Sequence, residues 1–284
     1  RGKSELTINP DGSPKTPTKG LDKDYITQFS YAKLETFNLF IPRFMGGGNY
    51  ENVGFESNIY QFLKDKTDPR QAKEFAQYAP LYWGKQPIVE APAYIGAILI
   101  FLFVIALFLV KGKLKNWLVG AVIFSILLSW GKNFEIVTNL FIDYVPMYNK
   151  FRAVSSIQVI AELAIPLLAI LGLKEWFSKK ISSEVKFDAL KKSIYIVGGL
   201  ALIFTLFGTS LFAFEGLRDE SYDNLLPGLL DAIIADRKAV FFSDSLRTFV
   251  FVVLSAGVLW LLLKDKIKQN IAIIALVVLI LVDL

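Results

Sequence analysis

Six apolar stretches run through the last two-thirds of the chain, and lysine is concentrated in every second connection between them. The stretches are residues 92–110, 117–130, 155–173, 193–214, 247–263 and 270–284. The lysines that follow the first, third and fifth stretches are Lys111, Lys113, Lys115, Lys174, Lys179, Lys180, Lys186, Lys191, Lys192, Lys264, Lys266 and Lys268. Cytoplasmic connections of multi-span proteins carry an excess of Lys and Arg. The pattern predicts an all-α polytopic membrane protein with about six transmembrane helices and lysine-rich cytoplasmic connections.

The composition agrees with this class. Hydrophobic residues make up 54% of the chain and charged residues 20%, with a mean hydropathy of +0.45. The formal net charge of +5 does not indicate nucleic-acid binding, because the lysines flank apolar stretches and form no basic stripe with aromatic residues. Anionic lipid headgroups are the partners that such lysines predict.

The chain contains no Cys and no His. Thiol nucleophiles, disulfides, Cys/His zinc sites and imidazole bases are therefore excluded. Acid–base chemistry would fall to Asp, Glu, Lys or Tyr, and a divalent metal would need carboxylate and carbonyl ligands. The residue pattern identifies no metal site.

We expect two regions, an extracytoplasmic loop and juxtamembrane region over 1–91 and a transmembrane domain over 92–284. Within the first, residues 1–25 have the composition of a surface loop. Residues 26–45 are aromatic and too short to span, which favours a buried or interfacial segment. Residues 55–79 predict one or two short helices broken at Asp68-Pro69. Because the chain lacks an initial Met and stops inside an apolar run, we expect an internal fragment of a longer protein.

Two connections, 131–154 and 215–246, should share the extracytoplasmic face with residues 1–91. In the second, apolar residues repeat at helical spacing over 222–238, opposite Asp231, Asp236 and Arg237. A single apolar stripe predicts an amphipathic helix lying flat on the outer surface. Its charged residues, with Asp244, are expected to form a solvated face with local ion pairs.

Basic residues on the outer side run against the orientation bias and need a partner. Lys132 begins the first outer connection, Lys150 and Arg152 end it, and Arg247 stands at the start of the fifth stretch. A phosphate suits these residues, since Arg offers a fork of donors and Lys a mobile charge. The alternative is pairing with Glu135, with Asp143 or with lipid headgroups.

A polar stripe continues into the third stretch. Ser155, Gln158 and Glu162 are spaced i, i+3 and i+7, so they share one helix face. Glu162 would lie about 10 Å below the outer surface, where an ionisable group faces a cavity or a partner. Pro166 removes a backbone hydrogen bond one turn deeper and can open such a cavity. The alternative is a structural hydrogen bond to another helix.

A third group lies in the juxtamembrane segment. Glu35, Asn38 and Arg43 place a carboxylate, an amide and a cation within one short apolar run. They could line a polar substrate cleft, with Arg43 near a phosphate. They could equally cap and clamp a small helix.

Four segments resemble the bacterial YfhO family of polytopic membrane proteins. They are residues 30–47 (SYAKLETFNLFIPRFMGG), 93–96 (AYIG), 128–133 (LSWGKN) and 144–152 (YVPMYNKFR). The family is similar to the GT-C class of glycosyltransferases. The resemblance implies transfer of a sugar from a polyprenyl-phosphate donor to a cell-envelope polymer or lipid acceptor, on the outer face of the bacterial cytoplasmic (inner) membrane.

The same resemblance implies an essential acidic residue in an outer loop upstream of this chain. Glu35 and Glu162 are the candidates for a catalytic carboxylate within it, and no catalytic residue is assigned. Lys132, Lys150, Arg152, Arg43, Gln158 and Arg247 are the candidate substrate-binding residues. The class allows a divalent metal cofactor.

Two other functions fit the same residues. In a transporter or flippase of a lipid-linked or anionic substrate, Glu162 and Pro166 would be coupling elements within the membrane. In a non-catalytic assembly subunit, residues 1–90 and 215–246 would be docking surfaces.

Overall fold

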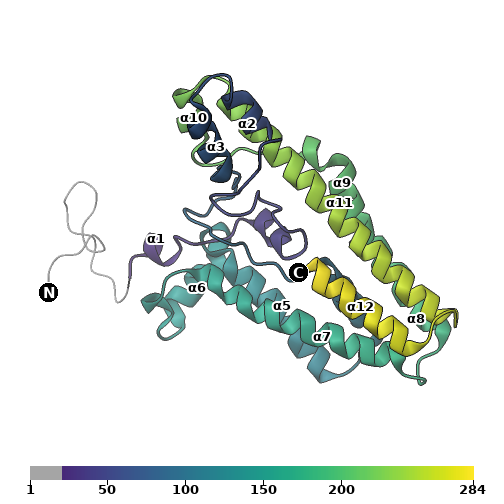
Figure 1. Cartoon of the computed structure of the whole chain (residues 1–284). Helices are drawn as coiled ribbons and strands as arrows, with labels where there is room; N and C mark the ends of the chain where they lie inside the picture. Colours follow the sequence, from purple (N-terminus) through teal and green to yellow (C-terminus); the bar gives the residue numbers. More distant parts are fainter. Residues whose placement is uncertain (1–20) are drawn as a thin grey trace.

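The computed structural model describes residues 21–284, so nearly all of the surface loop expected over 1–25 lies outside the described residues. The described part is helical, and its β-structure is limited to one isolated bridge between Glu51 and Ala79. Figure 1 shows the helices arranged as two groups that diverge from each other. The all-helical class is confirmed.

In the described part of the chain, short helices come first, and from α4 onward longer helices alternate with short ones. The α-helices are α1 (Lys23–Ile26), α2 (Asn58–Leu63), α3 (Pro69–Gln77), α4 (Ala97–Leu109), α5 (Lys113–Ser129), α6 (Glu135–Tyr144), α7 (Val159–Phe177), α8 (Ser183–Ser193), α9 (Gly199–Leu211), α10 (Asp219–Leu225), α11 (Leu229–Leu263) and α12 (Gln269–Asp283). Four 3-10 helices are η1 (Lys33–Leu39), η2 (Gly131–Phe134), η3 (Tyr148–Lys150) and η4 (Val154–Gln158), and η5 (Ile194–Gly198) is a π-helical turn.

Three helices among the described residues are long and apolar enough to cross a membrane. They are Val154–Phe177 with 24 residues, Ser183–Leu211 with 29 and Leu229–Leu263 with 35. The helices α5 and η2–α6 are long and apolar enough to cross a membrane only when they are taken together, and the angle between them is 111°. The apolar helices α4 and α12 have 13 and 15 residues, below the roughly 20 needed to span. Membrane-length helices are therefore confirmed for the third, fourth and fifth predicted stretches.

The expected flat helix over 222–238 is not formed. Helix α10 ends at Leu225, and Pro227 and Gly228 separate it from α11, with Gly228 at a φ of +86°. A Pro lacks the amide that continues a helix, and Gly adopts positive φ without strain. From Leu229 the chain is helical without a break to Leu263. The amphipathic segment is thus the first part of the longest membrane-length helix.

The two helices expected within 55–79 are present, and their caps explain their bounds. Ser57 Oγ accepts from the backbone N–H of Tyr60 at the start of α2 (3.2 Å). Asp68 Oδ1 accepts from the backbone N–H of Arg70 (2.8 Å), and Pro69 occupies the first turn of α3. Asp at the N-cap followed by Pro is a strong start signal.

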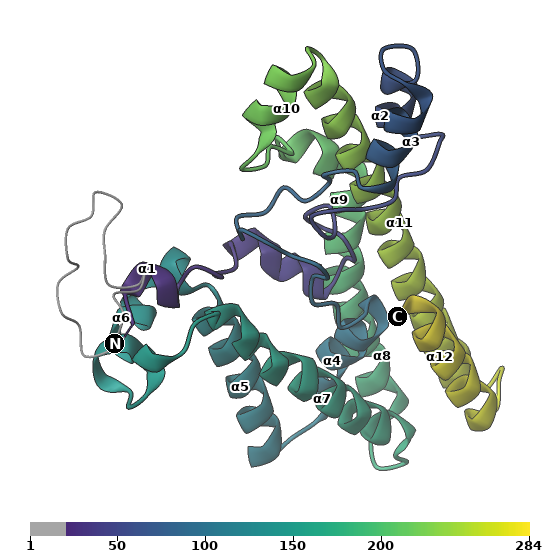
Figure 2. The same ribbon diagram turned by 60° about the vertical axis from the view of Figure 1, so that its left-hand side comes forward.

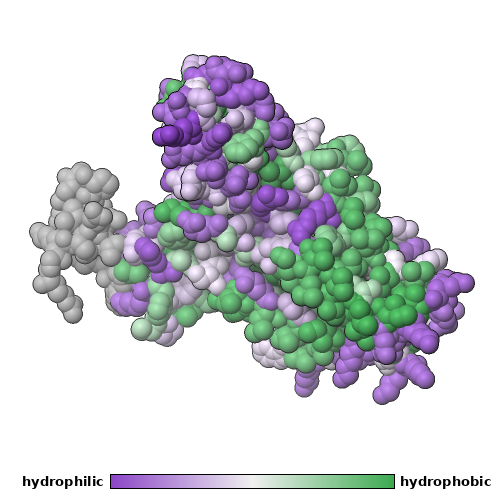
Figure 3. All heavy atoms as spheres, in the orientation of Figure 1, coloured by the Kyte–Doolittle hydropathy of each residue, from purple (hydrophilic) through white to green (hydrophobic). Residues whose placement is uncertain are grey.

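The connections predicted to share one face meet at one end of the helices, called here the loop end. The backbone N–H of Tyr31 donates to the carbonyl of Ser129 (3.0 Å), and that of Ser155 donates to the carbonyl of Phe29 (3.1 Å). Figure 2 shows the turns of the three lysine-containing connections, residues 110–112, 178–182 and 264–268, at the opposite end, called here the lysine end. Figure 3 shows a hydrophobic zone between a hydrophilic top and a hydrophilic lower edge.

An aromatic cluster fastens the juxtamembrane segment to the long helices. The ring of Phe44 is fully buried, and its centroid lies 5.1 Å from those of Phe204 on α9 and Phe241 on α11. Trp83 and Phe214 extend the cluster, with centroids 4.9 Å apart. Edge-to-face packing of this kind adds stability beyond area burial. The expectation of a buried segment over 26–45 is confirmed.

Candidate functional site: a polar cleft at the loop end

A cleft of about 680 Å³ opens at the loop end between residues 86–93 and the start of the third membrane-length helix. This polar cleft is lined by Phe29, Tyr31, Gln86, Ile88, Val89, Glu90, Ala91, Ala93, Arg152, Ala153, Ser155, Ser156, Gln158, Val159 and Glu162. The stripe of Ser155, Gln158 and Glu162 therefore faces a single cleft, together with Arg152. Of the residues predicted as candidate site residues, the structure brings Arg152, Gln158 and Glu162 together.

Gln158 lines the cleft and carries a buried polar atom without a partner among the described residues. Its side chain is 2% exposed, and Nε2 donates to Ser129 Oγ (3.0 Å). Ser129 in turn donates its hydroxyl proton to the carbonyl of Ile126 (2.8 Å). This arrangement fixes the amide orientation, because Ser129 can only accept from Gln158. Gln158 Oε1 then has no hydrogen-bond partner among the described residues, which costs about 1–3 kcal/mol for a buried group.

Arg152 supplies the positive charge of the cleft. Its guanidinium lies 5.3 Å from the ring centroid of Tyr25 and 5.6 Å from that of Phe29. Nη1 donates to the Tyr25 hydroxyl (3.0 Å). A guanidinium has five N–H donors, so this contact orients Arg152 and leaves donors for an anion.

Glu162 and Tyr31 complete the polar lining. Glu162 is exposed in the cleft, and Pro166 lacks the N–H that would bond the carbonyl of Glu162 in a regular helix. Burial raises the pKa of the Tyr31 phenol, and the nearby carboxylates of Glu35 and Glu162 raise it further. Tyr31 is therefore a neutral hydroxyl. The cleft combines a cation, a carboxylate, a neutral hydroxyl and an amide oxygen.

Glu35 stands behind the cleft, not in it. It is 1% exposed. The Tyr82 hydroxyl and the Lys85 backbone N–H (3.2 Å) donate to Oε1, and the Ala32 backbone N–H donates to Oε2 (2.5 Å). Burial raises the pKa of the Glu35 carboxyl despite these donors. Of the two alternatives, the helix-capping one describes the contacts that Glu35 makes in the structure, and these contacts position the segment next to the cleft.

The Glu35 contacts hold the wall of the cleft. The Tyr82 hydroxyl accepts from the backbone N–H of Gln86 (2.9 Å), and Gln86 lines the cleft. Gly84 allows the carboxylate to approach, since a Cβ at this position would lie 1.9 Å from Glu35 Oε1. Residues 82–86 are thus fixed by one buried carboxylate.

The cations Arg43 and Arg247 have protein partners in the structure. Arg43 donates through Nε and Nη2 to Asp244, each at 2.8 Å. Arg247 Nη2 donates to the carbonyls of Val282 (3.1 Å) and Asp283 (2.5 Å). Neither arginine lines the polar cleft. Arg43 thus joins the juxtamembrane segment to α11, and Arg247 joins α11 to α12.

Lys132 and Lys150 are also not among the residues that line the cleft. Lys132 is exposed on η2, where its backbone N–H donates to Ser30 Oγ (3.1 Å). Lys150 is exposed at the end of η3. Glu135, an alternative partner for these cations, pairs with Lys23 (3.2 Å).

The charged set expected as a solvated face is mainly buried. Asp236, Arg237 and Asp244 are 4%, 1% and 3% exposed. Asp236 accepts from the backbone N–H groups of Asn58 (2.8 Å) and Ile59 (2.9 Å), which caps α2. The sequence signal for this burial is the adjacent pair of charges, Asp236 and Arg237, within an apolar helical run. Charged side chains that are buried in such a run need partners from the protein.

Among residues 21–284, no group of three or more metal-ligating side chains is arranged to hold an ion. No protein-family model, curated protein or solved structure matches this chain. The fold and the cleft define a helical protein with membrane-length apolar helices and a polar cleft at their loop end.

Proposed function

We propose that this chain is part of a GT-C-like glycosyltransferase that resembles the YfhO family. It would transfer a sugar from a polyprenyl-phosphate donor to a cell-envelope polymer or lipid acceptor. The polar cleft is the proposed site. The observation that carries the proposal is that Gln158, whose buried amide oxygen has no hydrogen-bond partner among the described residues, lines the same cleft as the Arg152 cation.

The cleft offers a chemical group for each part of a sugar phosphate. Arg152 would contact the phosphate and stabilise the negative charge that develops as the bond between the anomeric carbon and the phosphate oxygen breaks. The Gln158 oxygen would accept a hydrogen bond from a sugar hydroxyl. The acceptor oxygen would bond to the anomeric carbon as the polyprenyl phosphate leaves, and Glu162, or the acidic residue that the resemblance implies, would take the proton of the acceptor hydroxyl.

Sugar transfer by the full-length protein in proteoliposomes tests these roles. Arg152→Ala should lower kcat/KM roughly 10- to 150-fold, the range for a lost hydrogen bond to a charged group. Arg70→Ala, which removes an exposed arginine on α3, is the matched control and should leave transfer unchanged. Unchanged transfer by the Arg152 variant would refute the assignment.

Gln158→Leu provides a second, distinct signature. The leucine removes the unpartnered oxygen, so the variant should unfold at the same or a higher temperature than the wild type. It should nevertheless lose roughly 2- to 10-fold in donor affinity, the range for one neutral hydrogen bond. A variant that binds the donor normally would show that the oxygen serves no ligand.

The same proteoliposomes separate the two rival functions. Movement of the lipid-linked donor across the bilayer without sugar transfer would indicate a transporter or flippase. Neither transfer nor movement would favour the assembly subunit.

We propose six crossings in the bacterial inner membrane, with the loop end outside. Helix α4, the bent pair α5 and η2–α6, and α12 would add three crossings to the three membrane-length helices. The chain lacks Cys, so single cysteines can be labelled without further changes. Cysteines placed at 113 and 266 should react only from the cytoplasmic side, and labelling from outside would overturn this orientation.

A further inference from the structure

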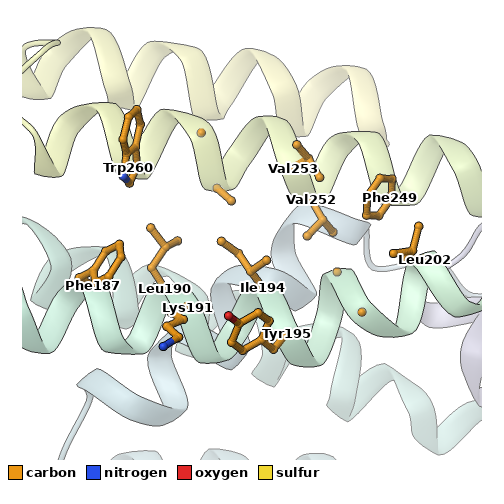
Figure 4. Close-up of a pocket in the computed structure, with 14 residues that line it drawn as sticks. Phe187, Leu190, Lys191, Ile194, Tyr195, Leu202, Phe249, Val252, Val253 and Trp260 are labelled. Carbon is orange, nitrogen blue, oxygen red and sulfur yellow. The ribbon is translucent and has the colours of Figure 1, made fainter.

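A second hollow lies among the apolar helices, and it shares no lining residue with the polar cleft. It has a volume of about 540 Å³ and runs between α8–η5–α9 and α11. Figure 4 shows Leu190, Ile194 and Val252 directed into the space between the two helices. The lipid groove, as we name it, is lined by Phe187, Leu190, Lys191, Ile194, Tyr195, Gly198, Gly199, Leu202, Phe249, Val252, Val253, Ala256, Gly257 and Trp260.

Missing side chains account for the hollow. A Cβ added at Gly199 or at Gly257 would meet no atom within 4 Å. At Gly198 the nearest atom would be Val252 Cγ1 at 3.6 Å. The π-helical turn η5 lies at the same level, and such turns occur frequently at functional sites. The sequence thus leaves open space between two helices that a leucine on either side would fill.

Lys191 is the one charged residue among those that line the lipid groove, and it lies in the half of the groove nearer the lysine end. Lys191 is exposed, and its Nζ lies 5.9 Å from the ring centroid of Tyr195. The neighbouring Lys192 is paired with Asp188 (2.6 Å), whereas Lys191 has no ion pair in the described part of the chain. Tyr195 and Trp260 place amphipathic rings at this level, as is typical of a membrane interface.

We propose that the lipid groove binds an anionic phospholipid, with one acyl chain in the groove and the phosphate at Lys191. An acyl chain matches the apolar lining, and a negative headgroup matches Lys191, the one cation among the lining residues. An apolar helix of another chain would match the lining but would leave Lys191 unexplained. The site is independent of the polar cleft and of the proposed sugar transfer.

The test compares lipid retention by the full-length protein, purified in detergent and examined by native mass spectrometry. The probes are phosphatidylglycerol and phosphatidylcholine with identical acyl chains. The wild type should retain phosphatidylglycerol in preference. Lys191→Gln should lower that preference about fivefold, the effect of one lysine near an anionic surface, while Lys192→Gln should change it less.

Filling the groove should abolish retention of both lipids. Gly199→Leu and Gly257→Leu add a side chain where a Cβ meets nothing, and leucine is the better helix former, so both variants should fold. Gly120→Leu on α5, where a Cβ likewise meets nothing within 4 Å, is the matched control. Normal lipid retention by both groove variants would overturn the proposal. So would a wild-type dimer that these variants convert to a monomer, because the occupant would then be a second copy.

Discussion

Removal of the Arg237 guanidinium should loosen the whole loop end. Arg237 projects from α11 and forms a bidentate pair with Asp219, through Nη1 to Oδ2 (2.7 Å) and Nη2 to Oδ1 (2.9 Å). It also donates to the backbone carbonyls of Leu81 (3.1 Å), Phe214 (2.8 Å) and Pro80 (3.0 Å). One side chain therefore joins three segments that are distant in sequence.

The expected cost follows from the burial of both charges. Arg237 is 1% exposed and Asp219 7%. Removing one partner of such a pair leaves an uncompensated buried charge, which costs about 3–5 kcal/mol. Replacing both partners by groups of similar volume is often neutral for the pair itself. Arg237→Met should thus lose about 4 kcal/mol of unfolding free energy, and adding Asp219→Asn should recover part of it.

Chemical unfolding in detergent measures the two single variants and the double variant as a cycle. We expect a coupling energy of at least about 2 kcal/mol, since buried partners are strongly non-additive. Hydrogen exchange should increase at residues 80–82 and 214–219 in Arg237→Met. Arg218→Met, which removes an exposed arginine next to the pair, is the control and should change stability by no more than about 0.5 kcal/mol.

Two outcomes would refute this reasoning. A loss below about 1 kcal/mol for Arg237→Met would mean that the pair is solvated. Simple additivity of the two single variants would mean that the carboxylate and the guanidinium do not stabilise each other.

Three further predictions concern the surrounding contacts. Because burial raises the pKa of Glu35 above 4.5, the folded state holds this proton more tightly. The melting temperature should therefore fall as the pH rises from about 4.5 through the raised pKa, and Glu35→Gln should remove that fall. Gly208→Ala places a Cβ 2.2 Å from Phe241 Cε1 and should cost about 1–3 kcal/mol in chemical unfolding. Arg43→Ala leaves the buried Asp244 carboxylate without its partner and should cost roughly 1–2 kcal/mol of unfolding free energy. The cost is this small because the Arg43 side chain is 40% exposed. Adding Asp244→Asn should recover the loss.

Each of these has a result that would contradict it. A wild type and a Glu35→Gln variant with parallel pH profiles would place the carboxyl in solvent. A Gly208→Ala variant with the stability of the wild type would mean that α9 and α11 separate readily. A further loss on adding Asp244→Asn to Arg43→Ala would show that Asp244 has another essential partner.

Local patterns in the sequence predicted local structure well. The lysine distribution predicted the class, Asp68-Pro69 marked the break between α2 and α3, and the i, i+3, i+7 spacing placed Gln158 and Glu162 on one face that the structure shows lining a cleft. The last two inferences depend on residues within a few turns of each other. Helical geometry alone relates such residues.

Contacts between distant segments could not be predicted from spacing. Arg43 and Asp244 are 201 positions apart, so the two predictions for Arg43, a place near a phosphate and a role in clamping a small helix, did not include Asp244. The same limitation made the charges of Asp236 and Arg237 look solvated. The structure shows that these side chains bind loop segments, because the helix that carries them extends beyond its apolar part.

The length of α11 has a mechanical consequence. Its 35 residues extend about 52 Å, whereas the hydrocarbon core is about 30 Å thick. One continuous helix therefore joins the buried Arg237, near its start, to Trp260, which lines the lipid groove near its end. A tilt of about 5° at one end displaces the opposite end by about 5 Å over this length. A molecule that binds one tilt better at either end must, by reciprocity, favour that tilt at the other.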